Sequence, residues 1–430
     1  MKRAIITVGL GFGDEGKGAT VDFLTREFEA ELVIRYCGGS QAGHNVELLD
    51  GRRHTFSQFG AGTLAPTPAR TFLGPAVVID PPALMREAQH LAELGVASPL
   101  QLVTIHPQCL VTTPWLRMLN RIRELSRGDT RHGSCGVGVG EARNYWLKHG
   151  GDAVFASDLQ TPDLLRQKLE LQRQRVLLEV QPLLAGCSPK ALNDSDLLAW
   201  ETSANYVAEM LCDPRWREIK IHPDAPPHKV AILEGAQGVL LDEYRGFHPH
   251  TTWSTVTPHH AWELVEQMGS EEVALLGITR AFTTRHGAGP LPTYSEELTT
   301  RFPDPGNPWN AWQGQFRYGW LDLELLRYAA TVAGPLDGLV VNHLDQIHET
   351  DFQLCEGYRN QSLTPASQPN LAWQSHLTEQ VQNSEPILTV TNSDRLLRTL
   401  EAIAPIVIKG NGPTHVNRTS TGLTFRKKRL

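Results

Sequence analysis

A glycine-rich segment near the start of the chain, GLGFGDEGKGAT, has residue types and a spacing that suit phosphate chemistry. Gly11 to Lys17 fits the spacing of a phosphate-binding loop, in which a Gly, four residues and a Gly-Lys pair follow a strand. The next residue is normally Ser or Thr, whose hydroxyl holds Mg²⁺, but here it is Gly18. Two carboxylates, Asp14 and Glu15, also lie inside the loop, where they would repel a phosphate.

The composition of this loop suits a site that combines a phosphate with a metal ion. Its glycines let the backbone approach a ligand closely, and the helix that follows would direct its N-terminus at the phosphate. Lys17 adds a positive charge. An Asp can bind Mg²⁺ or act as a base beside the phosphate, so Asp14 can replace the missing hydroxyl. The alternative is that Asp14 only caps the helix.

Short apolar runs that end at Gly, Asp or Glu predict the strands that position this loop. Many are dense in Val and Ile, which is typical of strands buried on both faces. The runs are residues 5–8, 32–34, 77–79, 103–105, 230–233, 273–276, 339–341, 387–390 and 406–408. Helical patterns fall between them, as at Val21, Leu24 and Phe28, and after Asp80 with its two prolines. We therefore predict an α/β fold with a mostly parallel central sheet flanked by helices, similar to the P-loop NTPases.

The chain is expected to form a single domain over residues 1–430, with excursions. A stretch rich in Leu, Gln, Arg and Glu predicts a helical excursion at about 160–215. A polar, mixed stretch predicts a surface insertion at about 355–386. Pro and Gly cluster at 301–314 and indicate a long loop, a kind of segment that is often functional.

Composition narrows the class of protein. The 430 residues are 40% hydrophobic and 20% charged, and the net charge is −7, which argues against a nucleic-acid-binding protein. The N-terminal apolar run lacks the length and cleavage site of a signal peptide, and no apolar run approaches membrane-spanning length, so no membrane partner is expected. The six cysteines form no Cys-x-x-Cys pair, which indicates reduced thiols in the cytoplasm.

The stretch GFGDEGKGATVDFL resembles the N-terminal signature of the adenylosuccinate synthetases, in which W-G-D-E-G-K-G-K is typical. Further matches follow in the order that this family has. They are RYCGGSQAGHN (35–45), EGAQGVLLD (234–242), TTRHGAGPLPT (283–293), YGWLD (318–322), VNHLD (341–345) and GNGP (410–413). The resemblance therefore extends over nearly the whole chain.

The resemblance implies a reaction and its cofactors. The family joins IMP and L-aspartate with GTP as co-substrate and Mg²⁺ as cofactor, and it works as a homodimer. The γ-phosphoryl group of GTP is first transferred to O6 of the purine, and the amine then displaces phosphate at C6. Such chemistry needs a base for the N1 proton, an acid at the phosphoryl group and a metal ion to offset charge.

The resemblance assigns roles to particular residues. Asp14 is implied to be the base and a metal ligand, and the backbone carbonyl of Gly43 a second metal ligand. His44 corresponds to the acid near the γ-phosphate. The nucleotide-binding residues implied are Gly13, Glu15, Gly16, Lys17 and Gly18 in the first loop, Asp345 reading guanine, and Gly412 and Pro413 walling the base pocket.

Four further residues are implied to bind the substrates. Gln237 corresponds to the Gln on the purine base, and Gln41 stands where the family has an Asn on the phosphate. Thr252 stands where a Thr binds the 5′-phosphate, and Arg317 lies in the loop that binds the amine. Gln237 could instead be a turn residue, and Thr252 an ordinary loop residue.

The departures from the family gather around the substrates. In SCGVGVGE (134–141), Cys135 replaces a Thr and Val137 an Arg. The Arg that crosses the dimer has no clear counterpart, although Lys148 and His149 lie near its place. The amine loop WQGQFRYGW (312–320) has lost most of its arginines and gained aromatics. Either Arg317 suffices, or the amine is less acidic than aspartate.

Three functions are compatible with these residues. The first is adenylosuccinate synthetase itself. The second is a specialised paralogue that uses the same chemistry on another purine or with another amine. The third is a GTP-binding pseudoenzyme, which the presence of both Asp14 and His44 disfavours. Because His343 stands where a Lys is usual, the choice between GTP and ATP is open as well.

Overall fold

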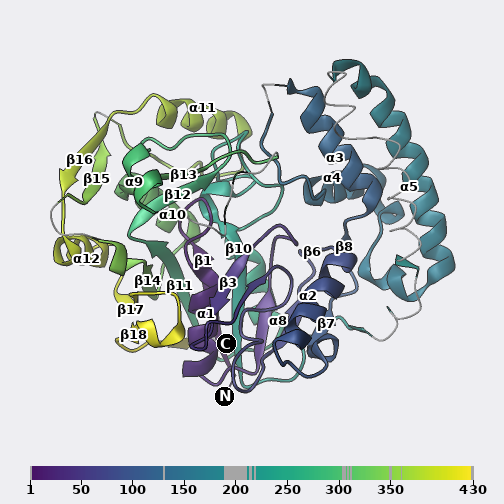
Figure 1. Ribbon diagram of the computed structural model, residues 1–430, viewed down its shortest axis with the longest axis horizontal. Coiled ribbons are helices and arrows are strands. Elements are labelled where there is room, and N and C mark those ends of the chain that lie inside the picture. Colours follow the sequence, from purple (N-terminus) through teal and green to yellow (C-terminus); the bar gives the residue numbers. More distant parts are fainter. Residues whose placement is uncertain are drawn as a thin grey trace.

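The structure is a computed structural model. It describes residues 2–128, 131–187, 211–212, 216, 219–302, 307, 309, 312–347, 351–359 and 361–427. Over these residues an eleven-stranded sheet forms the centre of the molecule (Figure 1). No helix in the described part of the chain is long and apolar enough to cross a membrane.

The central sheet is mostly parallel, as predicted. Its order is β18-β17-β14-β11-β1-β10-β2-β5-β7-β9, and β19 pairs with β11. The strands are β1 (Arg3–Gly9), β2 (Leu32–Arg35), β5 (Arg70–Leu73), β7 (Val103–Ile105), β9 (Lys220–Ile221), β10 (Val230–Gly238), β11 (Glu272–Arg280), β14 (Gly338–Asn342), β17 (Ile406–Gly410), β18 (Arg418–Ser420) and β19 (Arg426–Lys427). Within the described residues, the antiparallel pairs of this sheet are β17–β18 and β11–β19.

Helices cover both faces of this sheet, because successive side chains of a strand point to opposite faces. Ile6 and Val8 of β1 belong to one apolar cluster together with α8, α10 and α12, whereas Ile5 belongs to a second cluster with α1 to α5. The helices are α1 (Lys17–Glu27), α2 (Pro81–Glu93), α3 (Pro114–Ser126), α4 (Val139–His149), α5 (Pro162–Leu183), α8 (His259–Gln267), α9 (Glu296–Arg301), α10 (Leu323–Ala333), α11 (Leu371–Gln382) and α12 (Ser393–Glu401). Short 3₁₀ helices are η1 (Pro99–Leu102), η3 (Gly150–Asp152), η4 (Ala156–Gln160), η5 (Leu184–Gly186), η7 (Val239–Leu241), η8 (Leu344–Gln346) and η9 (His415–Asn417).

A second sheet of four strands lies beside the first and was largely missed by the sequence pattern. It has the order β12-β13-β15-β16 and consists of β12 (Phe282–His286), β13 (Phe316–Asp322), β15 (Gln353–Tyr358) and β16 (Pro386–Val390). The run at 387–390 was predicted as a strand and forms one, but it is not buried on both faces as the composition of many of these runs suggests. It forms the antiparallel edge β16, where Val390 is 60% exposed.

Two short pairs of strands complete the topology. One is the hairpin of β3 (His44–Glu47) and β4 (Arg53–Phe56), and the other is β6 (Val78–Ile79) with β8 (Leu110–Val111). The run at 77–79 therefore belongs to this second pair and lies outside the central sheet. The hairpin bears on the candidate site because it carries His44.

The predicted excursions are partly visible. Helix α5 packs against α3, and these two stand together with α4 at one side of the molecule (Figure 1). Residues 188–210 and 213–215 of the predicted helical excursion lie outside the described residues. The predicted surface insertion contains helix α11, whose Leu377 and Val381 are buried in the core. The division of the chain into domains stays a prediction.

Asp322, at the end of β13, is a buried carboxyl that joins the second sheet to helix α10. It accepts hydrogen bonds from the backbone N–H groups of Glu324 and Leu325, at 3.0 and 3.1 Å, and from the Tyr358 hydroxyl at 2.7 Å. Burial raises its pKa to about 6, from 3.8. The folded chain therefore holds this proton more tightly than the unfolded chain does.

This pKa predicts how stability changes with pH. A raised carboxyl pKa contributes stability that is full below about pH 4 and is lost as the pH rises through about 6. The change of about two pKa units corresponds to about 3 kcal/mol. We expect the free energy of unfolding of the wild type, relative to Asp322→Asn, to fall by about this amount between pH 4 and pH 8. Urea denaturation measures it, and parallel pH curves for the two proteins would refute the assignment.

Candidate active site

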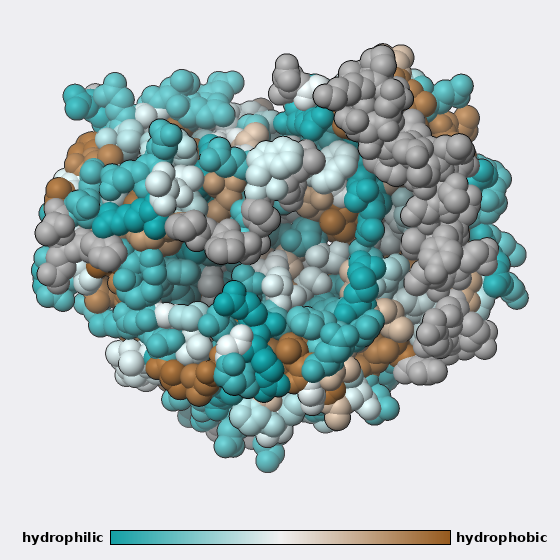
Figure 2. Space-filling view, viewed as in Figure 1, coloured by the Kyte–Doolittle hydropathy of each residue, from teal (hydrophilic) through white to brown (hydrophobic). Residues whose placement is uncertain are grey.

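The predicted site residues gather at the carboxyl ends of the central strands. Strand β1 runs into the glycine loop, β10 carries the segment from Glu234 to Gln237, and β11 and β14 end at Arg280 and Asn342. Ligands of open parallel sheets bind beyond these strand ends, next to the point where the strand order reverses. Figure 2 shows this face hollowed near its centre, where β1 and β10 lie in Figure 1.

The loop after β1 needs backbone conformations that favour glycine. Gly13 and Gly16 have φ values of 98° and 86°. Asp14, between them, has a φ of 58°, which an Asp tolerates better than most residues do. Gly16 is the N-cap of α1 and offers no side-chain cap. The first-turn N–H groups of α1 are therefore left for an anionic ligand.

Glu15, one of the two carboxylates in the loop, has a structural role. It is 3% exposed and accepts hydrogen bonds from the N–H groups of Gly11 and Gly13, at 3.0 and 2.8 Å. The ammonium group of Lys17, equally buried, lies 2.5 Å from its other oxygen. The side chains of Glu15 and Lys17 thus hold the loop together. That the loop contacts a nucleotide through them stays a prediction.

Close packing accounts for glycine at position 18, where a phosphate-binding loop usually has Ser or Thr. A Cβ at this position would lie 2.7 Å from the carbonyl carbon of His44 and 2.8 Å from the carbonyl oxygen of Asn45. The first turn of α1 therefore packs directly on the backbone of β3, and a Ser or Thr has no room. The same contact brings the GDEGKG loop and the histidine of the GHN motif into one site.

Restoring the usual serine is therefore expected to damage the protein. Gly18→Ser should lower the free energy of unfolding by about 1–3 kcal/mol, because the new side chain meets backbone atoms that cannot rotate away. Gly151→Ser is the matched control, since no atom lies within 4 Å of a Cβ there. Urea denaturation of both variants measures the difference, and equal stabilities would contradict the close contact.

Asp14, the second carboxylate, faces the open side of the loop. It is 28% exposed, and its Oδ2 lies 3.3 Å from Nε2 of His286. Burial raises the pKa of Asp14, but the hydrogen bond to His286 and the positive charges of Arg280 and Lys17 outweigh it and hold the pKa below its ordinary value. The ionised carboxylate is the form that binds Mg²⁺ or accepts a proton.

The donor set fits a magnesium ion. Oxygen ligands from carboxylates and backbone carbonyls are what Mg²⁺ prefers. Within the described part of the chain, Asp14 has no side-chain partner besides His286, so its Oδ1 is available to a metal. Gly43 is exposed at the start of β3, which makes its carbonyl accessible too.

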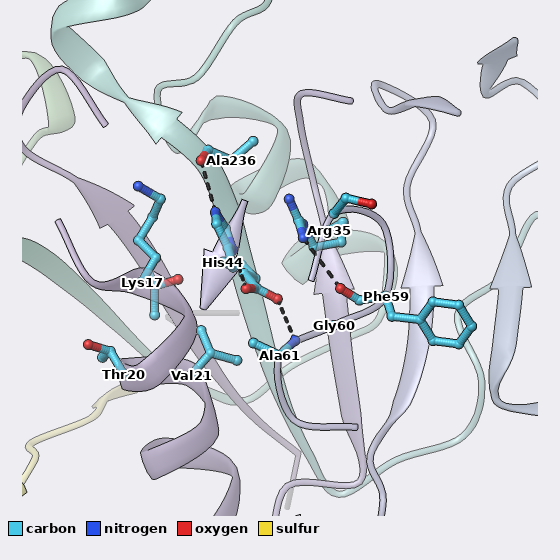
Figure 3. A network of polar contacts seen from close by, with 12 residues as sticks. Lys17, Thr20, Val21, Arg35, His44, Phe59, Gly60, Ala61 and Ala236 are labelled. Atoms are coloured by element: carbon cyan, nitrogen blue, oxygen red, sulfur yellow. Dashed lines mark hydrogen bonds and ion pairs between the residues drawn. The ribbon is translucent and has the colours of Figure 1, made fainter. Parts of the chain in front are cut away.

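His44 lies in a buried polar network beneath the loop (Figure 3). Its Nδ1 is 2.5 Å from a Glu234 oxygen, and its Nε2 is 3.0 Å from the carbonyl oxygen of Ala236. The other Glu234 oxygen accepts the N–H of Ala61 at 3.0 Å. Because both ring nitrogens face acceptors, the doubly protonated ring satisfies both contacts. A histidine in that state can act as an acid.

Charges around this network act in opposite directions. Burial and the guanidinium of Arg35 lower the pKa of His44 below its ordinary value, although the Glu234 carboxylate opposes them. Burial raises the pKa of Glu234, while Arg35 and His44 lower it and prevail. Glu234 is thus ionised, and its carboxylate favours a hydrogen on Nδ1 of His44.

The predicted purine-binding residues have polar atoms without partners. Gln41 and Gln237 each carry a buried Oε1 that accepts no hydrogen bond within the described part of the chain. A Cβ on Gly38 would lie 3.2 Å from Oε1 of Gln237, and one on Gly39 would lie 2.8 Å from Oε1 of Gln41. The two glutamines therefore flank one glycine pair. Buried acceptors without donors point to a missing ligand.

Arg285 contacts the segment of Thr252 and is the cross-strand neighbour of Arg317. The segment of Thr252 is held by its N–H bond to the Leu241 carbonyl, 2.8 Å, and by Arg285, whose Nη2 donates to the His250 carbonyl at 3.1 Å. Arg285 and Arg317 are cross-strand neighbours on β12 and β13. Nη2 of Arg317 donates to the carbonyls of Gly287 and Gly289, at 2.6 and 2.9 Å.

These two arginines make the region positive. Burial lowers the pKa of both, and the charge of Arg317 lowers the pKa of Arg285 further. Both donate to backbone carbonyls, and Arg285 also stacks on the face of Phe12 at 4.0 Å. A carboxylate ligand would balance this charge.

The residues predicted to bind guanine are linked through Arg418. Nη1 of Arg418 donates to the carbonyls of Gly412 and Pro413, at 3.3 and 3.4 Å, and its charge interacts with Asp345. Asp345 is exposed, and its Oδ2 accepts a hydrogen bond from the Gln346 amide at 2.7 Å. Arg280 Nη2 lies 3.0 Å from Nε2 of His343. Burial and Arg280 lower the pKa of His343 well below its ordinary value, so the ring is neutral.

The two loops that depart most from the family signature meet in space. The side chain of Trp312 would lie 3.1 Å from a Cβ on Gly136, and Arg121 stacks over that indole at 5.4 Å. Gly133, in the same loop, faces Gly287 and Ala288. The sequence changes in 134–141 and 312–320 therefore alter one wall, next to Arg317.

The comparison with protein families agrees with this geometry. The family model for adenylosuccinate synthetase matches residues 6–408. The chain belongs to the adenylosuccinate synthetase family. An adenylosuccinate synthetase from Clostridium botulinum (strain Alaska E43 / Type E3) is 30% identical over 359 residues, which cover 83% of this chain and 81% of that protein.

Two solved structures share the fold of this family member. The fully ligated adenylosuccinate synthetase from Plasmodium falciparum has a TM-score of 0.72 at 18% identity, covering 97% of this chain and 99% of that one. The succinoaminodeoxyadenylate synthetase of cyanophage S-2L, bound to dGMP and dATP, has a TM-score of 0.59 at 16% identity, with 98% and 96% covered. At these identities the likeness extends to the fold alone.

Several site residues of this adenylosuccinate synthetase family member escaped the sequence analysis. His286 contacts Asp14, and Glu234 contacts His44. Asn342 donates from its amide to the backbone carbonyl of Glu15 at 2.8 Å and so fixes the loop. All three stand inside the family motifs, so their place in a motif was the available signal. What each one touches depends on the fold.

Proposed function

We propose that this chain catalyses the reaction of its family, the GTP-dependent joining of IMP and L-aspartate. The family uses GTP and Mg²⁺ and forms a C–N bond in purine biosynthesis. The observation that carries the proposal is the close packing of Gly18 on the backbone of His44, where a Cβ would lie 2.7 Å from the carbonyl carbon. It supports a site in which a base, Asp14, and an acid, His44, serve one phosphoryl transfer.

In the first step, O6 of IMP attacks the γ-phosphorus of GTP. The bond to the bridging oxygen breaks, and GDP leaves. Asp14 takes the N1 proton, while His44 donates a hydrogen bond to the transferred group. Mg²⁺, when bound by Asp14 and the Gly43 carbonyl, supplies positive charge to the phosphates. Gln237 and Gln41 orient the nucleotide acceptor, and Thr252 binds its phosphate.

In the second step, the amine of aspartate attacks C6, the C6–O bond breaks and phosphate leaves. Arg317 supports this assignment because it is a largely buried cation that donates to carbonyl oxygens. An aspartate carboxylate brought there would pair with a charge that is already desolvated. On the nucleotide side, guanine is assigned to Asp345, with Gly412 and Pro413 beside it.

Two features, the free cysteines and the exposed apolar residues of α4, support a cytoplasmic homodimer. All six cysteines lie among the described residues and are free thiols, which suits a reducing compartment. On α4, Trp146 and Leu147 are 41% and 61% exposed, and a second copy of the chain would cover them. Lys148 and His149 end the same helix and lie near the place of the family's crossing Arg in the sequence.

One wall of the site favours a second candidate, the same chemistry with another amine. The side chain of Trp312 packs against Gly136, and Arg317 already donates hydrogen bonds to two backbone carbonyls. Such a wall suits an amine that is less acidic than aspartate. The second candidate also includes the same chemistry on a purine nucleotide other than IMP.

A panel of substrates tests the proposal. Purified protein with Mg²⁺ and GTP is given IMP, dGMP or another purine nucleotide, each with L-aspartate or a neutral amino acid, and products are identified by mass spectrometry. We expect adenylosuccinate and stoichiometric phosphate from IMP and aspartate only. Product from a different pair would establish the second candidate, and no phosphate from any pair would overturn both. Replacing GTP with ATP settles the nucleotide.

A further inference from the structure

We propose that His286 is a positioning residue for Asp14, which fixes the carboxylate for its metal ion and substrate. This inference rests on the proposed function, in which Asp14 is a metal ligand and base. No motif assigned a role to His286, although it stands in TTRHGAGPLPT. Its role follows from the contacts that the two side chains make.

The two acidic residues of the loop are held very differently. Glu15 receives three donors and is 3% exposed, so its carboxylate has one orientation. Asp14 is 28% exposed and has a left-handed backbone with φ of 58°. Among the described residues its only side-chain partner is His286, at 3.3 Å from Oδ2. The orientation of Asp14 therefore depends on this one contact.

His286 is itself well anchored. It is the last residue of β12, and its ring packs on Phe316 with the ring centroids 4.5 Å apart. Its Nε2 also lies 3.0 Å from Oδ1 of Asn307. The turn that follows is fixed by Arg317, which donates to the carbonyls of Gly287 and Gly289. A side chain held from three directions is suited to hold another.

The contacts also define which atom donates. Nε2 of His286 faces two oxygen atoms, on Asp14 and Asn307, and neither oxygen can donate a hydrogen. Nε2 therefore carries the hydrogen, which it donates to Oδ1 of Asn307 while it lies at ion-pair distance from Oδ2 of Asp14. The contact with His286 uses Oδ2 of Asp14 and leaves Oδ1 for the ligand. Carboxylates that bind metals commonly need such an outer partner, whose loss costs about 10–100-fold in metal affinity or activity.

Two substitutions separate positioning from packing. His286→Val removes the donor, whereas His286→Gln keeps an N–H group of comparable reach. His222→Val is the matched control, because His222 also lies beside a carboxylate, Asp224, with Nδ1 3.9 Å from Oδ2, but on the exposed surface just after β9. Each variant is made in the full chain and checked for its thermal transition.

The primary measurement is the affinity for Mn²⁺ in the presence of GTP, followed by electron paramagnetic resonance, with kcat and KM measured beside it. We expect His286→Val to weaken Mn²⁺ binding about 10–100-fold and to lower kcat, with KM for the amine changed less than about threefold. His286→Gln should recover most of the loss. In an Asp14→Asn background, His286→Val should have no further effect on Mn²⁺ affinity.

Unchanged Mn²⁺ affinity in His286→Val, or an equal loss in the Asp14→Asn background, would overturn the inference. Should His286→Val fail to fold, His286→Gln decides: wild-type affinity supports positioning by an N–H donor, and a full loss refutes it. Because Mn²⁺ binding needs no acceptor or amine, it separates this inference from the proposed function. If the wild-type protein makes no product but His286→Val weakens its Mn²⁺ binding, the proposed function fails and the positioning role of His286 stands.

Discussion

Asp14→Asn is expected to lower turnover by about 10³-fold or more, while nucleotide binding stays within about tenfold of the wild type. The amide cannot accept the N1 proton, and a positioned base contributes about 10²–10⁴-fold. It is also a poorer metal ligand than a carboxylate. Asn tolerates a φ of 58° as well as Asp does, so the loop should keep its shape. Phosphate release and calorimetry with GTP measure the two quantities.

Asp50→Asn is the control for this substitution, because Asp50 lies in an exposed turn and pairs with Arg52, away from the loop. It should leave both quantities unchanged. Turnover that survives Asp14→Asn would remove Asp14 from the mechanism. Loss of GTP binding together with turnover would mean that Asp14 supports the loop, as a helix-capping role predicts.

His44→Val is expected to lower both turnover and stability, for separable reasons. Loss of the acid should cost about 10²–10⁴-fold in kcat. Loss of the buried imidazole leaves the Glu234 carboxylate, fully buried, with the hydrogen bond from Ala61. Breaking a buried pair in this way costs about 3–5 kcal/mol in the free energy of unfolding.

A double variant distinguishes the two effects. In His44→Val with Glu234→Gln the buried charge is gone, so most of the stability should return, while turnover stays low. His376→Val, on the exposed side of α11, is the control for the change of residue type. If the double variant regains turnover, His44 matters only for packing. If it stays unstable, the contact with Glu234 is not what the imidazole provides.

The loop and the sheet could be predicted because both depend on local signals. Glycine spacing predicts a turn that approaches a ligand, and runs dense in Val and Ile predict buried parallel strands such as β1 and β10. The polar residues that follow those strands fall in motifs with a known order along the chain. The roles of Asp14, His44, Gln237 and Asp345 were predicted in this way.

What escaped prediction depends on contacts between distant segments. His286 lies 3.3 Å from Asp14 only because β12 belongs to a second sheet, and that sheet is built from mixed sequences. Strand β16 has the composition of a buried strand but lies at an edge, since period and composition do not tell which neighbours a strand has. The need for glycine at position 18 also depends on a distant segment, because the atoms that exclude a side chain there belong to β3.

The contact between Gly18 and β3 also limits how such a chain can be altered or recombined. The start of α1 and the hairpin of β3 and β4 pack backbone to backbone, so neither can be exchanged alone for a segment with a larger residue at the junction. A retreat of the hairpin that made room would withdraw His44 from the loop. In a chimeric protein, therefore, the glycine loop and His44 have to be inherited as one block.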